Sequence, residues 1–237
     1  MEFARIASAY EGELNYLTKR IAAMGGHAER MVEQAIAALV HADPALARKV
    51  VEDDAVLDEA QREVDDKAIV IIARRQPMAV DLREVIGAIR ISADLERVGD
   101  LAKNVAKRVA AVAEVGQPAR LFRGIEALAE LALAQLKQVL DVYASRSVDK
   151  LGFVRDRDGE IDAMYTSLFR ELLTHMMEDP RNITPCTHLL FCAKNIERIG
   201  DHATNIAETI YHIVTAEQMP AERPKGDKTD QLVLPAR

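Results

Sequence analysis

The sequence predicts an all-α protein built from two tandem three-helix bundles. Its composition is aliphatic: hydrophobic residues make up 49%, aromatic residues only 4%, and Trp is absent. Long runs of Ala, Leu, Ile and Val, with only 11 Gly and 8 Pro, favour helices. A phrase that occurs twice, 101 positions apart, indicates that a three-helix unit has been duplicated.

Six helical segments are predicted between five breaks. The breaks fall at 41–44, 74–81, 114–120, 145–149 and 178–185. Apolar residues recur every three or four positions, the spacing of a helix, in the first, third and fifth segments. In the first segment they are Leu17, Ile21, Met24, Ala28, Met31, Ala35 and Leu39. In the third they are Val98, Ala102, Val105, Val109 and Val112, and in the fifth Ile161, Tyr165, Leu168, Leu172 and Met176. No segment alternates with period two, so strands are not expected.

The joints between the segments define the expected domains. Pro77 ends the second helix, and Asp81 is available to cap the third. We expect a first bundle over 1–115 and a second over 116–217. Residues 218–237 hold three prolines and many charges, which is typical of a disordered tail.

Charge and hydropathy exclude several classes of protein. The formal net charge is −7, and no Lys/Arg stripe is interleaved with aromatics, so nucleic acid and anionic membranes are not expected partners. No window reaches 18 apolar residues, and the N-terminus lacks a signal-peptide core. Cys186 and Cys192 lie six residues apart, on different faces of a helix, which suits a reducing compartment. We expect a cytoplasmic protein.

The repeated phrase reads ERVGDLAKNVA at 96–106 and ERIGDHATNIA at 197–207. Seven of the eleven positions are identical, and two exchange Val for Ile. Positions i, i+4 and i+8 of a helix form one stripe, so each copy presents two carboxylates and an amide on one side. The two stripes consist of Glu96, Asp100 and Asn104, and of Glu197, Asp201 and Asn205.

These stripes are candidate metal sites. Like charges at i, i+4 repel by about 0.2–0.5 kcal/mol, a cost that a bound cation offsets. Oxygen donors suit hard or borderline cations. We predict metal ligation by Glu96, Asp100, Glu197 and Asp201, with Asn104 and Asn205 as secondary ligands.

The helix before each stripe offers a further carboxylate. Val64-Asp65 and Ile161-Asp162 each open an apolar run that ends at proline, and the second run is six residues longer. We therefore expect the fifth helix to be longer past this point, and Asp65 and Asp162 to reach the stripes from across a helix pair. Lys103 and Lys107 stand near the first stripe only, so the two sites need not be equivalent.

Gly99 and Gly200 interrupt the two stripes at the same point. Glycine inside a helix costs about 1 kcal/mol relative to alanine, so its repetition predicts close approach of another backbone or a ligand.

Two alternatives to a metal-binding adaptor remain open. The acids could pair with Arg97 and Arg198 in a purely structural module, an interaction worth little at a surface. A carboxylate-bridged metal enzyme is disfavoured, because the sequence has no Glu-x-x-His, nucleophile elbow or phosphate loop. Glu171–His175 and Glu208–His212 are weaker metal candidates. We expect no catalytic residues.

The two halves, each ending in ERxGDxAxN, resemble the PhoU family of bacterial phosphate-uptake regulators. The joints RRQPMAVDLREV and MMEDPRNI are also similar to those of the family, and the resemblance extends to about residue 217. It implies two three-helix bundles whose E/D-x-x-x-D motifs, here Glu96/Asp100 and Glu197/Asp201, bind iron, zinc, nickel, manganese or magnesium in some members.

The resemblance also implies a role and partners. Members act as cytoplasmic adaptors without catalytic activity. They connect the phosphate ABC transporter, through its ATPase PstB, to the sensor histidine kinase PhoR, and repress the phosphate-starvation regulon when phosphate is ample. We also expect a homodimer. Asp94 corresponds to Asn195, and Lys107 to Glu208, so metal number or affinity is expected to differ between the halves.

Overall fold

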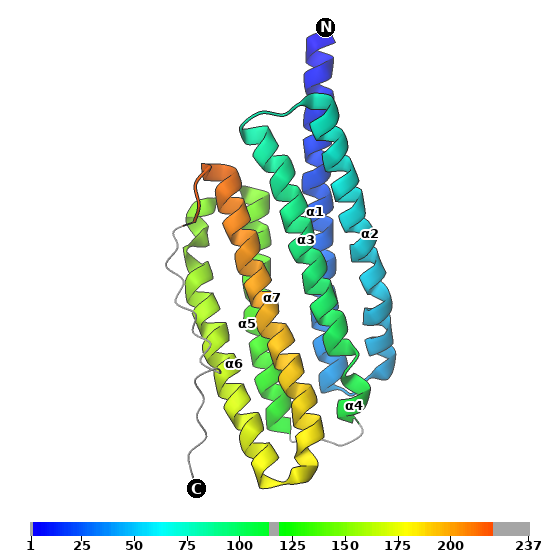
Figure 1. The fold of residues 1–237 in the computed structure, drawn as a ribbon, viewed down its shortest axis with the longest axis vertical. Helices are drawn as coiled ribbons and strands as arrows, with labels where there is room; N and C mark the ends of the chain where they lie inside the picture. The colour runs from blue at the N-terminus through cyan, green and yellow to red at the C-terminus, as the bar shows by residue number, and fades with distance from the viewer. Residues whose placement is uncertain (1, 114–118, 220–237) are drawn as a thin grey trace.

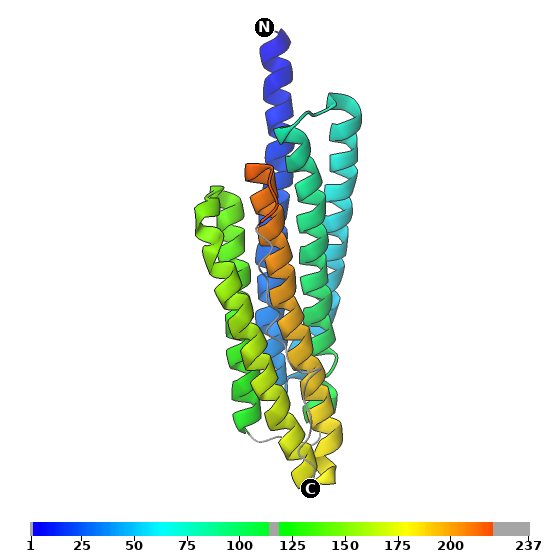
Figure 2. The same cartoon turned by 60° about the vertical axis from the view of Figure 1, so that its left-hand side comes forward.

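The computed structural model describes residues 2–113 and 119–219, and every regular element in those ranges is helical (Figures 1 and 2). The long helices are α1 (Glu2–Val40), α2 (Pro44–Arg75), α3 (Val80–Ala106), α5 (Ala119–Ser145), α6 (Phe153–Glu178) and α7 (Ile183–Thr215). Short pieces are α4 (Val109–Ala113) and the 3-10 helices η1 (Val148–Gly152) and η2 (Pro180–Asn182). The prediction of an all-α protein with two three-helix units is confirmed.

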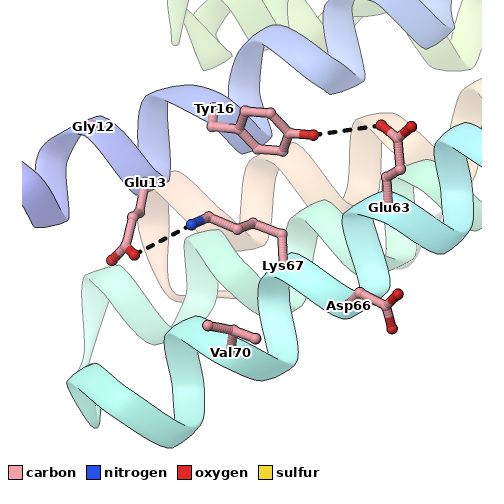
Figure 3. A pocket seen from close by; sticks show the side chains of 7 residues that line it. All are labelled: Gly12, Glu13, Tyr16, Glu63, Asp66, Lys67 and Val70. Carbon is pink, nitrogen blue, oxygen red and sulfur yellow. Dashed lines mark hydrogen bonds and ion pairs between the residues drawn. The ribbon is translucent and has the colours of Figure 1, made fainter.

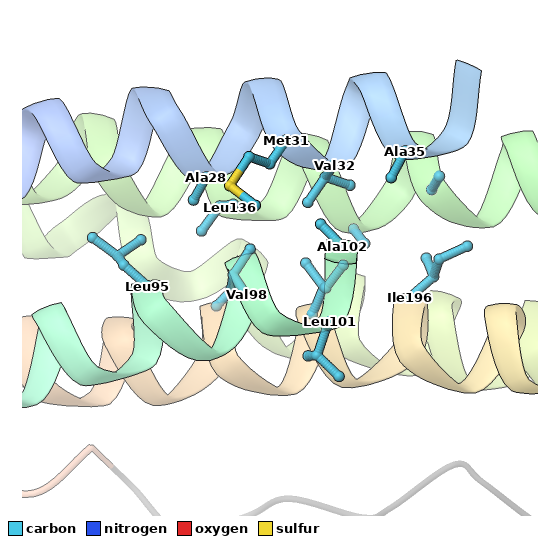
Figure 4. Close-up of a cluster of buried hydrophobic side chains, with 14 of the residues drawn as sticks. Ala28, Met31, Val32, Ala35, Leu95, Val98, Leu101, Ala102, Leu136 and Ile196 are labelled. Carbon is cyan, nitrogen blue, oxygen red and sulfur yellow. The ribbon is translucent and has the colours of Figure 1, made fainter. Parts of the chain in front are cut away.

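The two units lie side by side along their length. Successive long helices run in opposite directions, so α1–α3 and α5–α7 each form an up-and-down bundle (Figure 1). The units meet where α3 packs against α7 and α1 against α5. Figure 4 shows the shared core, in which Met31 of α1, Val98 of α3, Leu136 of α5 and Ile196 of α7 gather in one buried cluster. Each half therefore completes the hydrophobic core of the other.

Capping chemistry explains the start of α2 but not of α3. Asp43 accepts hydrogen bonds from the backbone N–H groups of Ala45 and Leu46 at 2.9 and 3.0 Å, and Pro44 occupies the first helical turn. Helix α3 instead begins at Val80 after Ala79, which has no side-chain cap and a φ of 49°. Asp81 lies inside the first turn, so its predicted capping role is wrong. A carboxylate there still interacts favourably with the helix dipole.

The third predicted helix is divided. It ends at Ala106, and α4 resumes at Val109 after a turn at 107–108. Val109 and Val112 are nevertheless buried, so the apolar spacing continues across the break. Apolar periodicity identified the buried face but not this interruption.

The predicted domain boundary and the predicted tail fall largely outside the described residues. The boundary at 115/116 lies between the two described ranges, and of the tail only 218–219 is described. Both remain predictions. None of the helices in the described ranges is both long and apolar enough to cross a bilayer.

The two glycines set the register between neighbouring helices. A Cβ at Gly99 would overlap Leu57 Cδ1, and a Cβ at Gly200 would lie 2.9 Å from Ile161 Cδ1. Side chains of α2 and α6 therefore approach the backbones of α3 and α7 at equivalent points. Close packing at both glycines is therefore present, but side chains make it, not another backbone or a ligand as predicted. It makes Leu57, not Val64, the counterpart of Ile161.

This register changes which acids are counterparts on the second and fifth helices. Helix α2 continues for 10 residues past Asp65 and α6 for 16 past Asp162, so the expected greater length of the fifth helix past this point is confirmed. Counted from Asp58, the acid that packing makes the counterpart of Asp162, α2 continues for 17 residues and the difference disappears. Asp65 lies two helical turns further along α2.

Candidate metal-binding site

Four carboxylates from two helices form the first acidic cluster, which consists of Asp54, Asp58, Glu96 and Asp100. Asp54 and Asp100 are close together because Lys103 Nζ donates to both, to Asp100 Oδ1 at 2.5 Å. Burial raises the pKa of Glu96, and the charge of Asp100 raises it further, with smaller effects from Asp58 and Asp54. Acids of α2 and α3 therefore face one another across this helix pair.

The second acidic cluster consists of Asp158, Asp162, Glu197 and Asp201, on α6 and α7. Glu197 is only 5% exposed, and burial raises its pKa to about 7, with further contributions from Asp201 and Asp162. Its Oε1 atom accepts from Lys194 Nζ at 2.8 Å, whereas Oε2 is buried without a hydrogen-bond partner. A buried carboxylate oxygen without a donor is costly, and a cation would satisfy it.

The structure brings most of the predicted ligands to these clusters. Glu96 and Asp100 face α2, and Glu197 lies near Asp162 as well as Asp201. Asp162, predicted from across the helix pair, is 8% exposed in the second cluster.

Three predicted residues lie elsewhere. Asp65 is two helical turns, roughly 10 Å, beyond Asp58. Its pKa is raised by burial and by neighbouring Asp66. Asn104 is exposed to solvent. Asn205 donates its Nδ2–H to Asp94 Oδ1 at 3.5 Å, across the contact between α7 and α3. Asp94 also contacts His202 Nδ1 at 2.8 Å, so it joins the two halves instead of serving the first cluster.

Sequence reasoning missed Asp54, Asp58 and Asp158. The signal was present, since D-x-x-x-D occurs at 54–58 and again at 158–162. Each pair lies at i, i+4 on the helix that faces a repeated phrase. The intervening residues differ, AVL against GEI, so a search for a repeated phrase does not find them.

Basic residues contact both clusters, in different ways. Arg97, 61% exposed, pairs with Glu96 at 3.5 Å and Asp100 at 3.1 Å, as the structural alternative predicted. Lys103 links α2 to α3. Its counterpart in the second half is Thr204, whose Oγ1 lies 3.0 Å from Asp158 Oδ1 and accepts from Gln135 Nε2 at 2.9 Å.

The side chains of the two clusters are of a type that binds metal ions, but they are not close enough together to coordinate one ion. Within 2–113 and 119–219, no three Asp, Glu, His or Cys side chains meet closely enough to hold a metal as they stand. Carboxylates repel one another without a cation between them. The donor set is still one that hard and borderline cations prefer, and the unpartnered oxygen of Glu197 is an open acceptor. Metal binding requires side-chain rotation on the existing helices.

The histidine pairs have other contacts. His175 Nδ1 lies 3.0 Å from Glu178 Oε2, and His212 Nδ1 lies 3.3 Å from the carbonyl oxygen of Glu217. A separate shallow pocket between α1 and α2 is lined by Gly12, Glu13, Tyr16, Glu63, Asp66, Lys67 and Val70 (Figure 3). In it, Lys67 pairs with Glu13 at 3.2 Å, and no member of either cluster lines it.

Comparison with known proteins identifies close relatives. The family model described as the PhoU domain matches residues 21–109 and 125–210. The phosphate-specific transport system accessory protein PhoU homolog of Rhizobium meliloti (strain 1021) is 68% identical over 232 residues, which cover 98% of each chain. The protein of that name from Caulobacter vibrioides (strain NA1000 / CB15N) is 49% identical, over 94% of this chain and 97% of the relative.

Two crystal structures have the same fold. PhoU from Pseudomonas aeruginosa superposes with a TM-score of 0.84 at 36% identity, covering 88% of this chain and all of that one. The phosphate transport system regulatory protein PhoU from Streptococcus pneumoniae gives 0.82 at 25% identity, covering 89% of this chain and 99% of that one.

Proposed function

Because this chain belongs to the PhoU family, we propose that it is a regulatory adaptor of phosphate-specific transport. The observation that carries the proposal is identity to named accessory proteins over nearly the full length of both chains. In this role it couples the phosphate ABC transporter, through the ATPase PstB, to the sensor kinase PhoR in the cytoplasm. It represses the phosphate-starvation response when phosphate is ample.

The adaptor binds metal through its second acidic cluster. Asp158, Asp162, Glu197 and Asp201 hold the ion in the second half. A bound metal would supply positive charge that neutralises these acids and, held by residues of both helices, would link α6 to α7. The side chains provide oxygen donors, and the helix pair fixes the spacing of the backbones. The donor set admits iron, zinc, nickel, manganese or magnesium.

The role requires no catalysis by this chain. Burial raises the pKa of the Cys192 thiol to about 12, so it is not a nucleophile near neutral pH. Cys186 is also buried, and burial raises its pKa. A non-metal scaffold remains the second candidate, because Arg97 pairs with two acids of the first cluster.

Complementation tests the adaptor role. In a Rhizobium meliloti (strain 1021) mutant without its own PhoU homolog, this chain should restore repression of phosphate-starvation genes in high phosphate. Purified protein should also retain PstB and the cytoplasmic part of PhoR in pairwise pull-downs. Failure of both experiments would contradict the adaptor role.

Metal analysis tests the second proposal separately. Untagged protein, refilled with iron, zinc or manganese, should carry metal that the variant Glu197→Gln/Asp201→Asn lacks. Near-zero metal content after refilling removes the metal and leaves the adaptor role standing.

A further inference from the structure

The two acidic clusters differ at one equivalent position on α3 and α7. Lys103 occupies it in the first half and Thr204 in the second, 101 positions later within the repeated phrase. The Lys103 ammonium donates to Asp54 of α2 and to Asp100 of α3. The Thr204 hydroxyl touches Asp158 and accepts from Gln135, so this position brings no positive charge to the second cluster.

Lys103 is firmly held. Its side chain is 19% exposed, and it pairs with Asp54 and Asp100, whose side chains are 9% and 26% exposed. An ordinary lysine is charged at neutral pH, and this ammonium lies between two carboxylates. It links α2 to α3, which is the role a metal would have there.

The cation on Glu197 is placed differently. Lys194 lies three residues before Glu197 on the same helix, and its side chain is 41% exposed. A long, half-exposed lysine can move into solvent when a metal arrives. Glu197 keeps a buried oxygen, Oε2, without a hydrogen-bond donor even though Lys194 donates to its other oxygen. Gln135, which donates to the Thr204 hydroxyl beside Asp158, also has a buried oxygen without a hydrogen-bond partner.

We propose that Lys103 is a built-in cation that closes the first acidic cluster to metal, so that this chain binds metal only in its second half. The inference rests on the proposed metal-binding function. It assigns the two homologous halves different cations: a covalently attached ammonium in one and an exchangeable metal in the other.

Exchange of the two residues tests the inference. Full-length, untagged chains are stripped with chelator and titrated with Mn²⁺ alone, and binding is followed by calorimetry and by the loss of the free-ion electron paramagnetic resonance signal. In the wild type, Glu197→Gln/Asp201→Asn should reduce Mn²⁺ binding to background, while Glu96→Gln/Asp100→Asn should leave it unchanged. Lys103→Thr should add binding that Glu96→Gln/Asp100→Asn then removes, and Thr204→Lys should abolish binding in the second half.

The outcomes separate the inference from its premise. Loss of Mn²⁺ binding with Glu96→Gln/Asp100→Asn in an otherwise wild-type chain overturns the inference while metal binding stands. No binding by any variant, Lys103→Thr included, overturns the metal function and the inference with it. Circular dichroism establishes that each variant is folded. If Lys103→Thr is poorly folded, Thr204→Lys decides: retained binding in that variant contradicts the inference.

Discussion

Lys103 Nζ on α3 donates to Asp54 on α2, whose side chain is only 9% exposed. The same ammonium holds Asp100 one turn earlier on its own helix, at 2.5 Å. One lysine thus compensates two acids from two helices. A charge buried with a single main partner makes the fold depend on that partner.

Removal of Lys103 should destabilise the protein. Lys103→Met leaves Asp54 buried without its cation, and we expect the free energy of unfolding to fall by about 2 kcal/mol, below the ~3–5 kcal/mol of fully buried pairs because Lys103 is partly exposed. Urea denaturation measures the change. Lys107→Met, at an exposed position one turn on, is the matched control and should change little. Adding Asp54→Asn to Lys103→Met should restore part of the loss, and a strictly additive double variant would refute the pairing.

Glu197 should make stability depend on pH in metal-free protein. Its pKa is about 7 in the folded chain, against 4.5 for an ordinary glutamate, because the carboxylate is buried. The folded state therefore binds more protons at this group between these values, so the stability that Glu197 contributes is fully present below about pH 4.5 and is lost as pH rises to 7. The expected loss from this group is on the order of 2–3 kcal/mol.

Glu197→Gln removes the titrating group and should flatten this part of the stability profile. Urea denaturation in chelator, from pH 5 to pH 8, provides the comparison. The exposed Glu208 lies on the same helix, and Glu208→Gln should retain the wild-type slope. An unchanged slope in Glu197→Gln would show that the burial of Glu197 does not control its protonation.

Apolar periodicity predicted the six long helices because each helix buries one face. Leu17, Ile21 and Met24, and likewise Ile161, Tyr165 and Leu168, are all buried as their spacing required. Periodicity did not locate the turn at 107–108, since Val109 and Val112 stay on the buried side.

The candidate site was predicted in part for a related reason. The repeated phrase identified the acids of α3 and α7, but the acids opposite them depend on how two antiparallel helices slide past each other. That register is set by packing, with Leu57 lodged against Gly99. Matching the acids as apolar-Asp pairs that each open an apolar run ending at proline selected Asp65 instead of Asp58. No local sequence pattern shows which acid of α2 lies opposite the acids of α3.

Gly99 should be intolerant of a side chain. A Cβ there overlaps Leu57 Cδ1, and Leu57 is itself 1% exposed, so it has little room to move. Although alanine favours a helix by about 1 kcal/mol, we expect Gly99→Ala to lower stability by about 1–2 kcal/mol. Gly12, also within a helix, has nothing within 4 Å of its Cβ position, and Gly12→Ala should stabilise the chain slightly. Thermal unfolding measures the stability of both variants. An equal gain in stability for Gly99→Ala and Gly12→Ala would contradict the close approach of Leu57 to Gly99.

Both cysteines should be unreactive toward thiol reagents until the protein unfolds. Cys186 and Cys192 are fully buried, and burial raises the pKa of Cys192 to about 12. At pH 8 the reactive thiolate is therefore scarce as well as inaccessible. A colorimetric disulfide reagent should detect no thiol in the native chain, and both thiols in guanidinium. Ser145→Cys, at an exposed position, supplies the control and should react at once in the native state. Reaction of the wild type as fast as that variant would mean that the core around α7 opens readily, because only such opening exposes these thiols.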